Sequence, residues 1–201
     1  MILPPPFYTR TDVGSIAKEL LGKVLVTNLE EKLTSGIIVE TEAYAGVSDK
    51  ASHAFGNRRT NRTEIMYANG GVAYVYLCYG IHHLFNIVTN TENTPHAILI
   101  RGIEPLEGIE TMLARRKKIQ LQPNLTAGPG AMSMALGIET LHSGLVLQGP
   151  EIVVEDRGLT VAPSEIVAAS RVGVAYAQED AYLPFRFYIK GNKFVSKGKG
   201  L

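Results

Sequence analysis

The sequence predicts an α+β fold built on a largely antiparallel sheet, and three observations lead to that expectation. Short runs rich in β-branched and aromatic residues follow one another along the chain, with few long helical stretches between them. The chain has 201 residues, of which 45% are hydrophobic and 19% are charged, so it can bury a sizeable core. No linker rich in Pro, Gly or Ser divides it. We therefore expect a single domain over residues 1–201.

The first elements are expected to be a capped helix and a strand pair. Residues 12–21 show apolar positions at helical spacing, and Thr11 or Asp12 provides a capping oxygen at the start. Residues 23–27 and 36–43 are rich in β-branched residues and are separated by a polar turn region. These two strands are expected to pair.

A long irregular segment and a β-hairpin follow. Residues 45–68 show no regular pattern, so we expect a loop with short helical turns, and long loops inside compact domains often carry function. Residues 72–78 form the strongest strand pattern in the chain, and residues 83–89 form its expected partner. The predicted tip, residues 79–82, contains a tyrosine, a glycine and an exposed isoleucine.

Weaker patterns predict the second half of the chain. A strand is expected over residues 97–101, followed by a helix over residues 104–118 whose basic last turn suits the helix dipole. The glycine turn at residues 128–130 opens a short helix that ends at Leu136. Residues 165–170 fit a helix or a strand equally well. Further strands are predicted over residues 145–147, 151–155 and 185–189.

Composition excludes several classes of protein. The formal net charge is +1, so nucleic-acid binding would have to depend on local basic clusters such as residues 57–62 and 115–118. Cys78 is the only cysteine, which excludes an internal disulfide and a multi-cysteine metal site. No apolar run approaches the roughly 18 residues of a membrane helix, and the N-terminus lacks the features of a signal peptide. A cytoplasmic location is therefore expected.

The segment Glu40-Thr41-Glu42-Ala43-Tyr44 is the strongest indication of chemistry. Strand side chains alternate between faces, so Ile38, Glu40, Glu42 and Tyr44 are expected on one side. Glu42, at the strand end, is the candidate general base, whereas Glu40 lies deeper in the strand and is expected to have a structural partner. A surface carboxylate paired with an arginine is the alternative for Glu42.

Three tyrosines crowd the predicted hairpin. Tyr74 and Tyr76 share one face of the strand, and Tyr79 follows at the turn. Ordinary core packing would account for them. Aromatic rings beside arginines also form platforms for stacked bases, and an aromatic wedge at a hairpin tip can fill the gap left by an extruded nucleotide.

Two other readings of the carboxylates stay open at this point. Two nearby acids could belong to a glycoside hydrolase. Glu40, Glu42 and His53 could together bind a metal ion, although no histidine has a reliable metal-binding spacing. We predict no metal and no cofactor.

Five motifs, taken together, resemble the alkyladenine (3-methyladenine) DNA glycosylase family. They are E-T-E-A-Y at residues 40–44, His53, Y-V-Y-L-C-Y-G at residues 74–80, Asn86 and L-I-R-G-I-E-P at residues 99–105. The likeness continues to S-R-V-G-V at residues 170–174 and F-R-F-Y-I-K-G at residues 185–191, so it covers nearly the whole chain. It implies a curved antiparallel sheet with flanking helices and a protruding β-hairpin.

The resemblance also implies catalytic roles. Glu42 matches the residue that activates a water for attack on C1′ of the target nucleotide, and Arg101 matches the arginine that holds that water and the carboxylate. The backbone carbonyl of Val172 is expected to touch the same water.

Further positions match the family's contacts with DNA. Tyr44, His53 and Tyr76 match the walls that enclose the flipped base, and Asn86 matches the side chain that crowds the purine 2-position. Tyr79 matches the residue that wedges into the minor groove. Arg58 and Arg62 are expected to contact phosphates.

The implied function is that of a monofunctional glycosylase in base excision repair. It would release an alkylated or deaminated purine from double-stranded DNA and leave an abasic site. We expect a monomer in the cytoplasm, associated with the nucleoid if the source is bacterial. A non-catalytic binder of damaged or distorted DNA is the alternative.

The chain departs from the family pattern at two places. Relatives often read G-P-G-K-L at the glycine turn, whereas Ala131 here replaces the lysine, which predicts weaker phosphate binding. Ile81, next to the wedge turn, stands at a position that varies among relatives.

Overall fold

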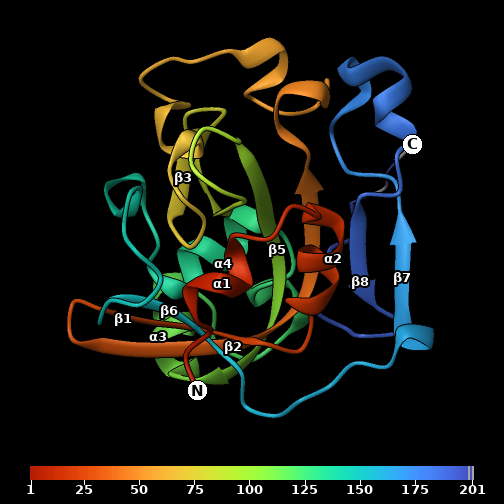
Figure 1. The fold of residues 1–201 in the computed structure, drawn as a ribbon. Coiled ribbons are helices and arrows are strands. Elements are labelled where there is room, and N and C mark those ends of the chain that lie inside the picture. The colour runs from red at the N-terminus through yellow and green to blue at the C-terminus, as the bar shows by residue number, and fades with distance from the viewer. Residues whose placement is uncertain (199, 201) are drawn as a thin grey trace.

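The computed structural model describes residues 1–198 and 200, and its strands form one strongly curled antiparallel sheet (Figure 1). The described strands are β1 (Val24–Leu29), β2 (Lys32–Tyr44), β3 (Ala73–Cys78), β4 (His82–Thr89), β5 (His96–Glu107), β6 (Ile152–Glu155), β7 (Ile166–Ala169) and β8 (Arg186–Ile189). Their order is β3-β4-β5-β2-β1-β6, and β8 pairs with both β2 and β7. This architecture confirms the predicted α+β class with its antiparallel curved sheet.

Short helices flank the sheet. The α-helices are α1 (Pro5–Tyr8), α2 (Val13–Glu19), α3 (Ile109–Arg115) and α4 (Pro129–Leu136). Short 3₁₀ helices span Gly46–Ser48, Phe55–Asn57, Glu64–Tyr67, Pro123–Leu125, Thr140–His142, Pro163–Glu165 and Ala175–Tyr182. Asp12 caps α2 by accepting from two backbone N–H groups, as its sequence position predicts. None of the helices in the described part of the chain is long and apolar enough to cross a membrane.

The sheet divides into two branches at strand β2. One of its edges pairs with β5 along most of its length, from Ser35 to Tyr44. Its other edge pairs first with β1, up to Ile37, and then with β8 at residues 40–42. In Figure 1 the pair β7 and β8 accordingly stands on the opposite side of the molecule from β1 and β6. Glu40 and Glu42 lie where the second branch begins.

The predicted helix over residues 104–118 is wrong at its start. Strand β5 continues to Glu107, and only Ile109–Arg115 is helical. Pairing with β2 prevails over local helix propensity here, and Pro105 is tolerated opposite Gly36, beside a shift of register. Gly108 has φ +70° and lies so close to the Leu33 carbonyl that a side chain would not fit.

Two smaller predictions also fail. The polar region 28–35 is mostly strand, because β1 and β2 are joined by Glu30 and Glu31 alone, with φ values of 55° and 58°. A two-residue hairpin turn of this kind usually contains Asn-Gly or Asp-Gly, so its sequence signal is missing. Residues 145–147 form only an isolated bridge between Val72 and Val146. The hairpin of β3 and β4 and the irregular segment 45–68 agree with the prediction.

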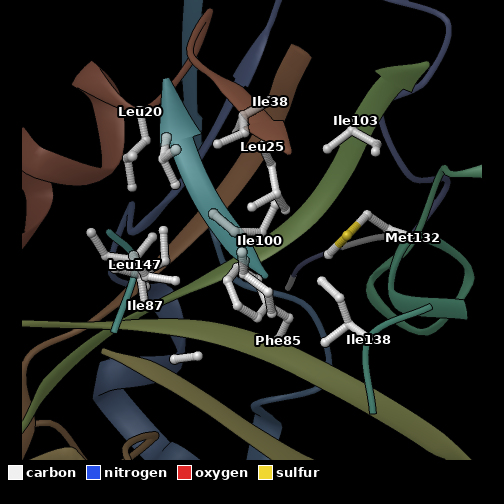
Figure 2. Close-up of a cluster of buried hydrophobic side chains, with 14 of the residues drawn as sticks. Leu20, Leu25, Ile38, Phe85, Ile87, Ile100, Ile103, Met132, Ile138 and Leu147 are labelled. Carbon is white, nitrogen blue, oxygen red and sulfur yellow. The ribbon is translucent and has the colours of Figure 1, made fainter. Parts of the chain in front are cut away.

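One face of the curled sheet surrounds the main hydrophobic core. Figure 2 shows Leu20, at the end of α2, and Met132, from α4, pointing toward strand side chains such as Phe85 and Ile100. Thr41 faces the same way, because its hydroxyl donates a hydrogen bond to a carbonyl of α2 at 2.9 Å. The helices therefore cover the inner face, and the opposite side chains of the same strands are available for a site.

A bulge in β2 sets which residues face the site. The pairing with β5 shifts register on both sides of Glu40, and a bulge of this kind breaks the alternation of side chains. Ile38 therefore lies in the core, whereas Glu40 and Glu42 both reach Arg101 on the other side. The expectation that Ile38 shares a face with the two acids is wrong for this reason.

Candidate active site

A cavity of about 400 Å³ lies on the face of the sheet opposite the core. This volume is within the range of about 300–1,000 Å³ that is usual for small-molecule sites. Nine of the ten predicted site residues line it: Glu42, Tyr44, His53, Arg62, Tyr76, Tyr79, Asn86, Arg101 and Val172. A larger and more open groove of about 780 Å³ lies beside it, but of its two lining acids Glu64 is paired with Arg59 at 2.7 Å and Glu92 is exposed. The smaller cavity is therefore the candidate active site.

Glu42 forms part of the wall of this cavity, and its side chain is completely buried. Oε1 accepts a hydrogen bond from the backbone N–H of Val172 at 2.7 Å. Oε2 accepts one from the Tyr44 hydroxyl at 2.8 Å and lies 3.3 Å from Nη1 of Arg101. A carboxylate offers about four acceptor positions. These three contacts leave one position on Oε1 for another donor.

The neighbours of Glu42 have defined protonation states. Burial works against the charge of Arg101, but Glu42 and Glu40 outweigh it, so the pKa of its guanidinium is raised. Burial, reinforced by Glu42, raises the pKa of the Tyr44 hydroxyl well above its usual value. Arg101 is therefore a cation and Tyr44 a neutral donor beside the carboxylate.

Glu40 is also buried, but it does not line the cavity. Its Oε1 accepts hydrogen bonds from Nε of Arg186 at 2.7 Å, from Nε of Arg101 at 3.0 Å and from Oγ of Ser196 at 2.9 Å. Its Oε2 accepts one from the Ser196 backbone N–H at 2.7 Å. These partners agree with a structural role. A glycoside hydrolase or a site for a metal ion would need Glu40 as a second carboxylate beside Glu42. Because Glu40 is bound by these partners and does not line the cavity, both alternatives lose support.

His53 is held in one tautomer by two neighbours. Nε2 lies 3.2 Å from Arg62, which can only donate, so Nδ1 carries the proton and donates to the Tyr74 hydroxyl at 2.8 Å. Burial, followed by the charges of Arg62 and Arg58, lowers the pKa of His53 to about 4. The ring is therefore neutral near pH 7, and it packs edge-on against Tyr76 with ring centres 4.7 Å apart.

Two arginines expected at phosphates lie close to this ring. The guanidinium carbon of Arg62 is 4.7 Å from the centre of the Tyr76 ring, in addition to the contact of Arg62 with His53. Arg58 is exposed and lines a smaller depression beside the cavity, of about 350 Å³. Their phosphate contacts stay predictions.

Three other predicted residues occupy distinct positions around the cavity. The side-chain N–H groups of Asn86 donate to the carbonyls of Tyr74 and Leu84, so its own oxygen is left as an acceptor. Tyr79 is 92% exposed at the hairpin tip. Val172 was expected to act through its carbonyl, and the contact that the structure contains is made by its N–H group.

The sequence did not reveal Arg171 as a supporting residue. Its guanidinium is fully buried, binds both carboxylate oxygens of Asp49, and lies 4.8 Å from the centre of the Tyr44 ring. Arg171 therefore fixes one wall of the cavity from behind. An arginine within the S-R-V-G-V stretch is visible in the sequence, but its partner lies 122 positions away.

Comparison with known proteins gives a consistent result. A family model described as Methylpurine-DNA glycosylase (MPG) matches residues 6–193. A Clostridium perfringens strain 13 protein is 48% identical over 205 residues, which cover 98% of this chain and 100% of its own length. A protein from Bacillus cereus strain G9842 is 46% identical, over 98% of this chain and 100% of its own length. A protein from Chlamydia felis is 45% identical, over 96% of this chain and 98% of its own length. All three carry the provisional name 3-methyladenine DNA glycosylase.

A match of this extent covers the whole candidate site, from Glu42 to Val172. The chain therefore belongs to the methylpurine-DNA glycosylase family and is a DNA glycosylase, a hydrolase that acts on N-glycosyl bonds.

Proposed function

We propose that this protein flips an alkylated or deaminated purine out of double-stranded DNA and hydrolyses its N-glycosidic bond, leaving an abasic site. One observation carries the proposal. Glu42 is buried at the wall of an aromatic-lined cavity, is held there by three contacts, and retains one acceptor position. A carboxylate arranged in this way can bind and deprotonate a single water.

The chemical step follows from that acceptor position. A water that donates to Oε1 of Glu42 gives its proton to the carboxylate as its oxygen forms a bond to C1′ of the nucleotide. The C1′–N bond breaks, and its electron pair leaves with the base. Atoms and charges balance without a cofactor. Because the step breaks no phosphodiester bond, the DNA strand stays intact.

The walls of the cavity suit a flipped purine. Tyr44 and Tyr76 offer electron-rich rings, which stack well on a purine that carries positive charge after alkylation. His53 is neutral near pH 7 and does not repel such a base. The carboxamide of Asn86 stands at the wall, where we assign it to crowding the 2-amino group of normal guanine.

The exposed hairpin suits a contact with duplex DNA. Tyr79 would enter the stack in place of the flipped nucleotide, and Arg58 and Arg62 would contact phosphates. We treat residues 1–201 as one glycosylase domain that acts as a monomer in the cytoplasm, or at the nucleoid of a bacterial cell.

Base release from a panel of duplexes tests the proposal. Each duplex would carry one lesion: 3-methyladenine, 7-methylguanine, hypoxanthine or ethenoadenine. A chelator would be present throughout. We expect release of at least one damaged purine, an abasic product that is cleaved only after alkali treatment, and no effect of the chelator. Binding of damaged duplexes without release of any base would overturn the proposal.

Glu42→Gln tests the role of the carboxylate. Glutamine keeps the size and the acceptor oxygen but cannot take a proton, so base release should fall by about 10²- to 10⁴-fold. Binding to a duplex with an abasic-site analogue should be retained, because Glu42 is buried and contacts no backbone phosphate in this scheme. Undiminished release by this variant would remove Glu42 from the mechanism.

A further inference from the structure

The chain continues beyond the matched family region, and its C-terminal segment (residues 194–198) returns to the centre of the sheet. Strand β8 ends at Ile189, and the family match ends at residue 193. The Phe194 carbonyl then passes so close to Gly102 of β5 that a Cβ at position 102 would lie 2.6 Å from it. A Cβ at Gly198 would likewise lie 2.8 Å from the Val172 side chain. The segment is therefore packed directly against the strand and the loop that carry the site.

This C-terminal segment meets a buried group of four charges. Glu40 and Glu42 are the carboxylates, and Arg101 and Arg186 are the guanidinium groups, so the formal charges cancel. All four side chains are at most 7% exposed. Buried charges of this kind require complete hydrogen bonding, because each unpaired donor or acceptor is costly.

Ser196 supplies much of that hydrogen bonding. Its backbone N–H and its hydroxyl donate to the two oxygens of Glu40, at 2.7 Å and 2.9 Å. The hydroxyl oxygen also accepts from Nη2 of Arg101 at 3.2 Å, and the carbonyl accepts from Nη2 of Arg186 at 3.2 Å. All three polar groups of one residue are therefore engaged with the buried charges.

The contact with Arg101 is the one that reaches the active site. Nε of Arg101 donates to Glu40, Nη2 donates to Ser196, and Nη1 faces Glu42 at 3.3 Å. A guanidinium group is planar and rigid, so fixing Nε and Nη2 fixes the direction of Nη1. Without the serine hydroxyl, the group could turn about its contact with Glu40 and move away from Glu42.

We propose that Ser196 is a positioning residue for the base-release reaction: its hydroxyl, held by Glu40, orients Arg101 toward Glu42. The inference rests on the proposed function, and it makes the C-terminal segment part of the active site. Ser196 does not line the cavity, so it acts through Arg101 and not on the substrate.

Ser196→Ala in the full chain tests this inference, with Ser196→Thr as the conservative variant. We expect the single-turnover rate of base release to fall about tenfold for alanine, since hydrogen bonds to two charged groups are lost. The Kd for a duplex with an abasic-site analogue should stay within about twofold. Threonine keeps the hydroxyl and should restore most of the rate. Ser164→Ala, at an exposed serine of the 3₁₀ helix Pro163–Glu165 that does not line the cavity, is the matched control and should behave like the unaltered protein.

Three outcomes would overturn the inference while leaving the proposed function intact. Ser196→Ala could release base at the rate of the unaltered protein. Its loss of rate could be matched by an equal loss of DNA affinity, which would mean a general structural role. Threonine could fail to rescue. If the unaltered protein itself released no base from any duplex, the proposed function would fail first.

Discussion

Glu40 and Glu42 are the same type of residue and stand two positions apart, but their contacts give them different roles. Glu40 accepts four hydrogen bonds from protein donors and does not line the cavity, so it is not placed to bind a water there. Glu42 has one remaining position and lines the cavity. The difference is made by partners far away in sequence, such as Val172 and Ser196, and not by the type of residue.

His53 gives a prediction at the scale of one residue. Its pKa is about 4 in the folded protein and 6.5 in the unfolded chain, so between these values only the unfolded chain binds a proton. The free energy of unfolding should therefore fall as the pH drops from about 6.5 to about 4. The contribution of this residue has an upper limit of about 3 kcal/mol.

Urea unfolding at several pH values would measure this effect, with His53→Gln as the comparison. The variant should lose less stability than the unaltered protein across the same window. His96 and His142 also have lowered pKa values, but they act equally in both proteins. Parallel pH curves for the two proteins would show that His53 is not buried as a neutral ring.

The hairpin of β3 and β4 shows how one element can serve two functions. Near its base, Tyr74 and Tyr76 point into the cavity. At its tip, Tyr79 has φ 50° and Gly80 has φ 72°, and both Tyr79 and Ile81 are exposed. A tyrosine in the left-handed region is sparsely populated and strained. An exposed, strained aromatic residue contributes little to folding, which agrees with a role in binding DNA.

Tyr79→Ser tests this element. The free energy of unfolding should change by less than about 0.5 kcal/mol, because the ring is 92% exposed. Release of a damaged base from duplex DNA should fall about 10- to 100-fold, because the wedge no longer offsets the loss of stacking. Release from single-stranded DNA should fall much less.

Tyr182→Ser is the matched control, since Tyr182 is 70% exposed and does not line the cavity. It should leave stability and release unchanged. An equal loss of activity on single-stranded and duplex DNA by Tyr79→Ser would contradict the wedge role.

At the scale of the whole molecule, a buried ion pair joins distant parts of the chain. Asp49 follows the end of β2, and Arg171 precedes the loop that donates to Glu42. Arg171 also donates to the carbonyls of Ala43 and Asp180. The second half of the chain is thereby fixed to the strand that carries Glu42.

Asp49→Ala should reduce the free energy of unfolding by about 3–5 kcal/mol, because it leaves the Arg171 charge buried without its partner. Urea denaturation measures the change. Glu179→Ala removes an exposed carboxylate that pairs with Lys50 at 2.7 Å, and it should cost less than about 1 kcal/mol. If the two variants lost similar amounts of unfolding free energy, the buried ion pair of Asp49 would stabilise the fold no more than the exposed pair of Glu179.

Local sequence patterns were sufficient to predict several elements correctly. The hairpin, the irregular segment 45–68 and the capped helix α2 agree with the prediction. The helix expected from residue 104 and the turn region 28–35 do not, because pairing with a neighbouring strand outweighed local propensity. A β-bulge leaves no mark in a single sequence, so the core position of Ile38 could not be foreseen.

The sequence by itself determined the family, the class of fold and nine of the residues around the cavity, because ordered motifs and strand periodicity are properties of neighbouring positions. Only the tertiary structure decided which acid faces the cavity and which partners hold it. The contact between Glu42 and Val172 spans 130 positions, and the contact between Glu40 and Ser196 spans 156. Contacts of that range arise from how the sheet curls and divides, and no local pattern of residues encodes them.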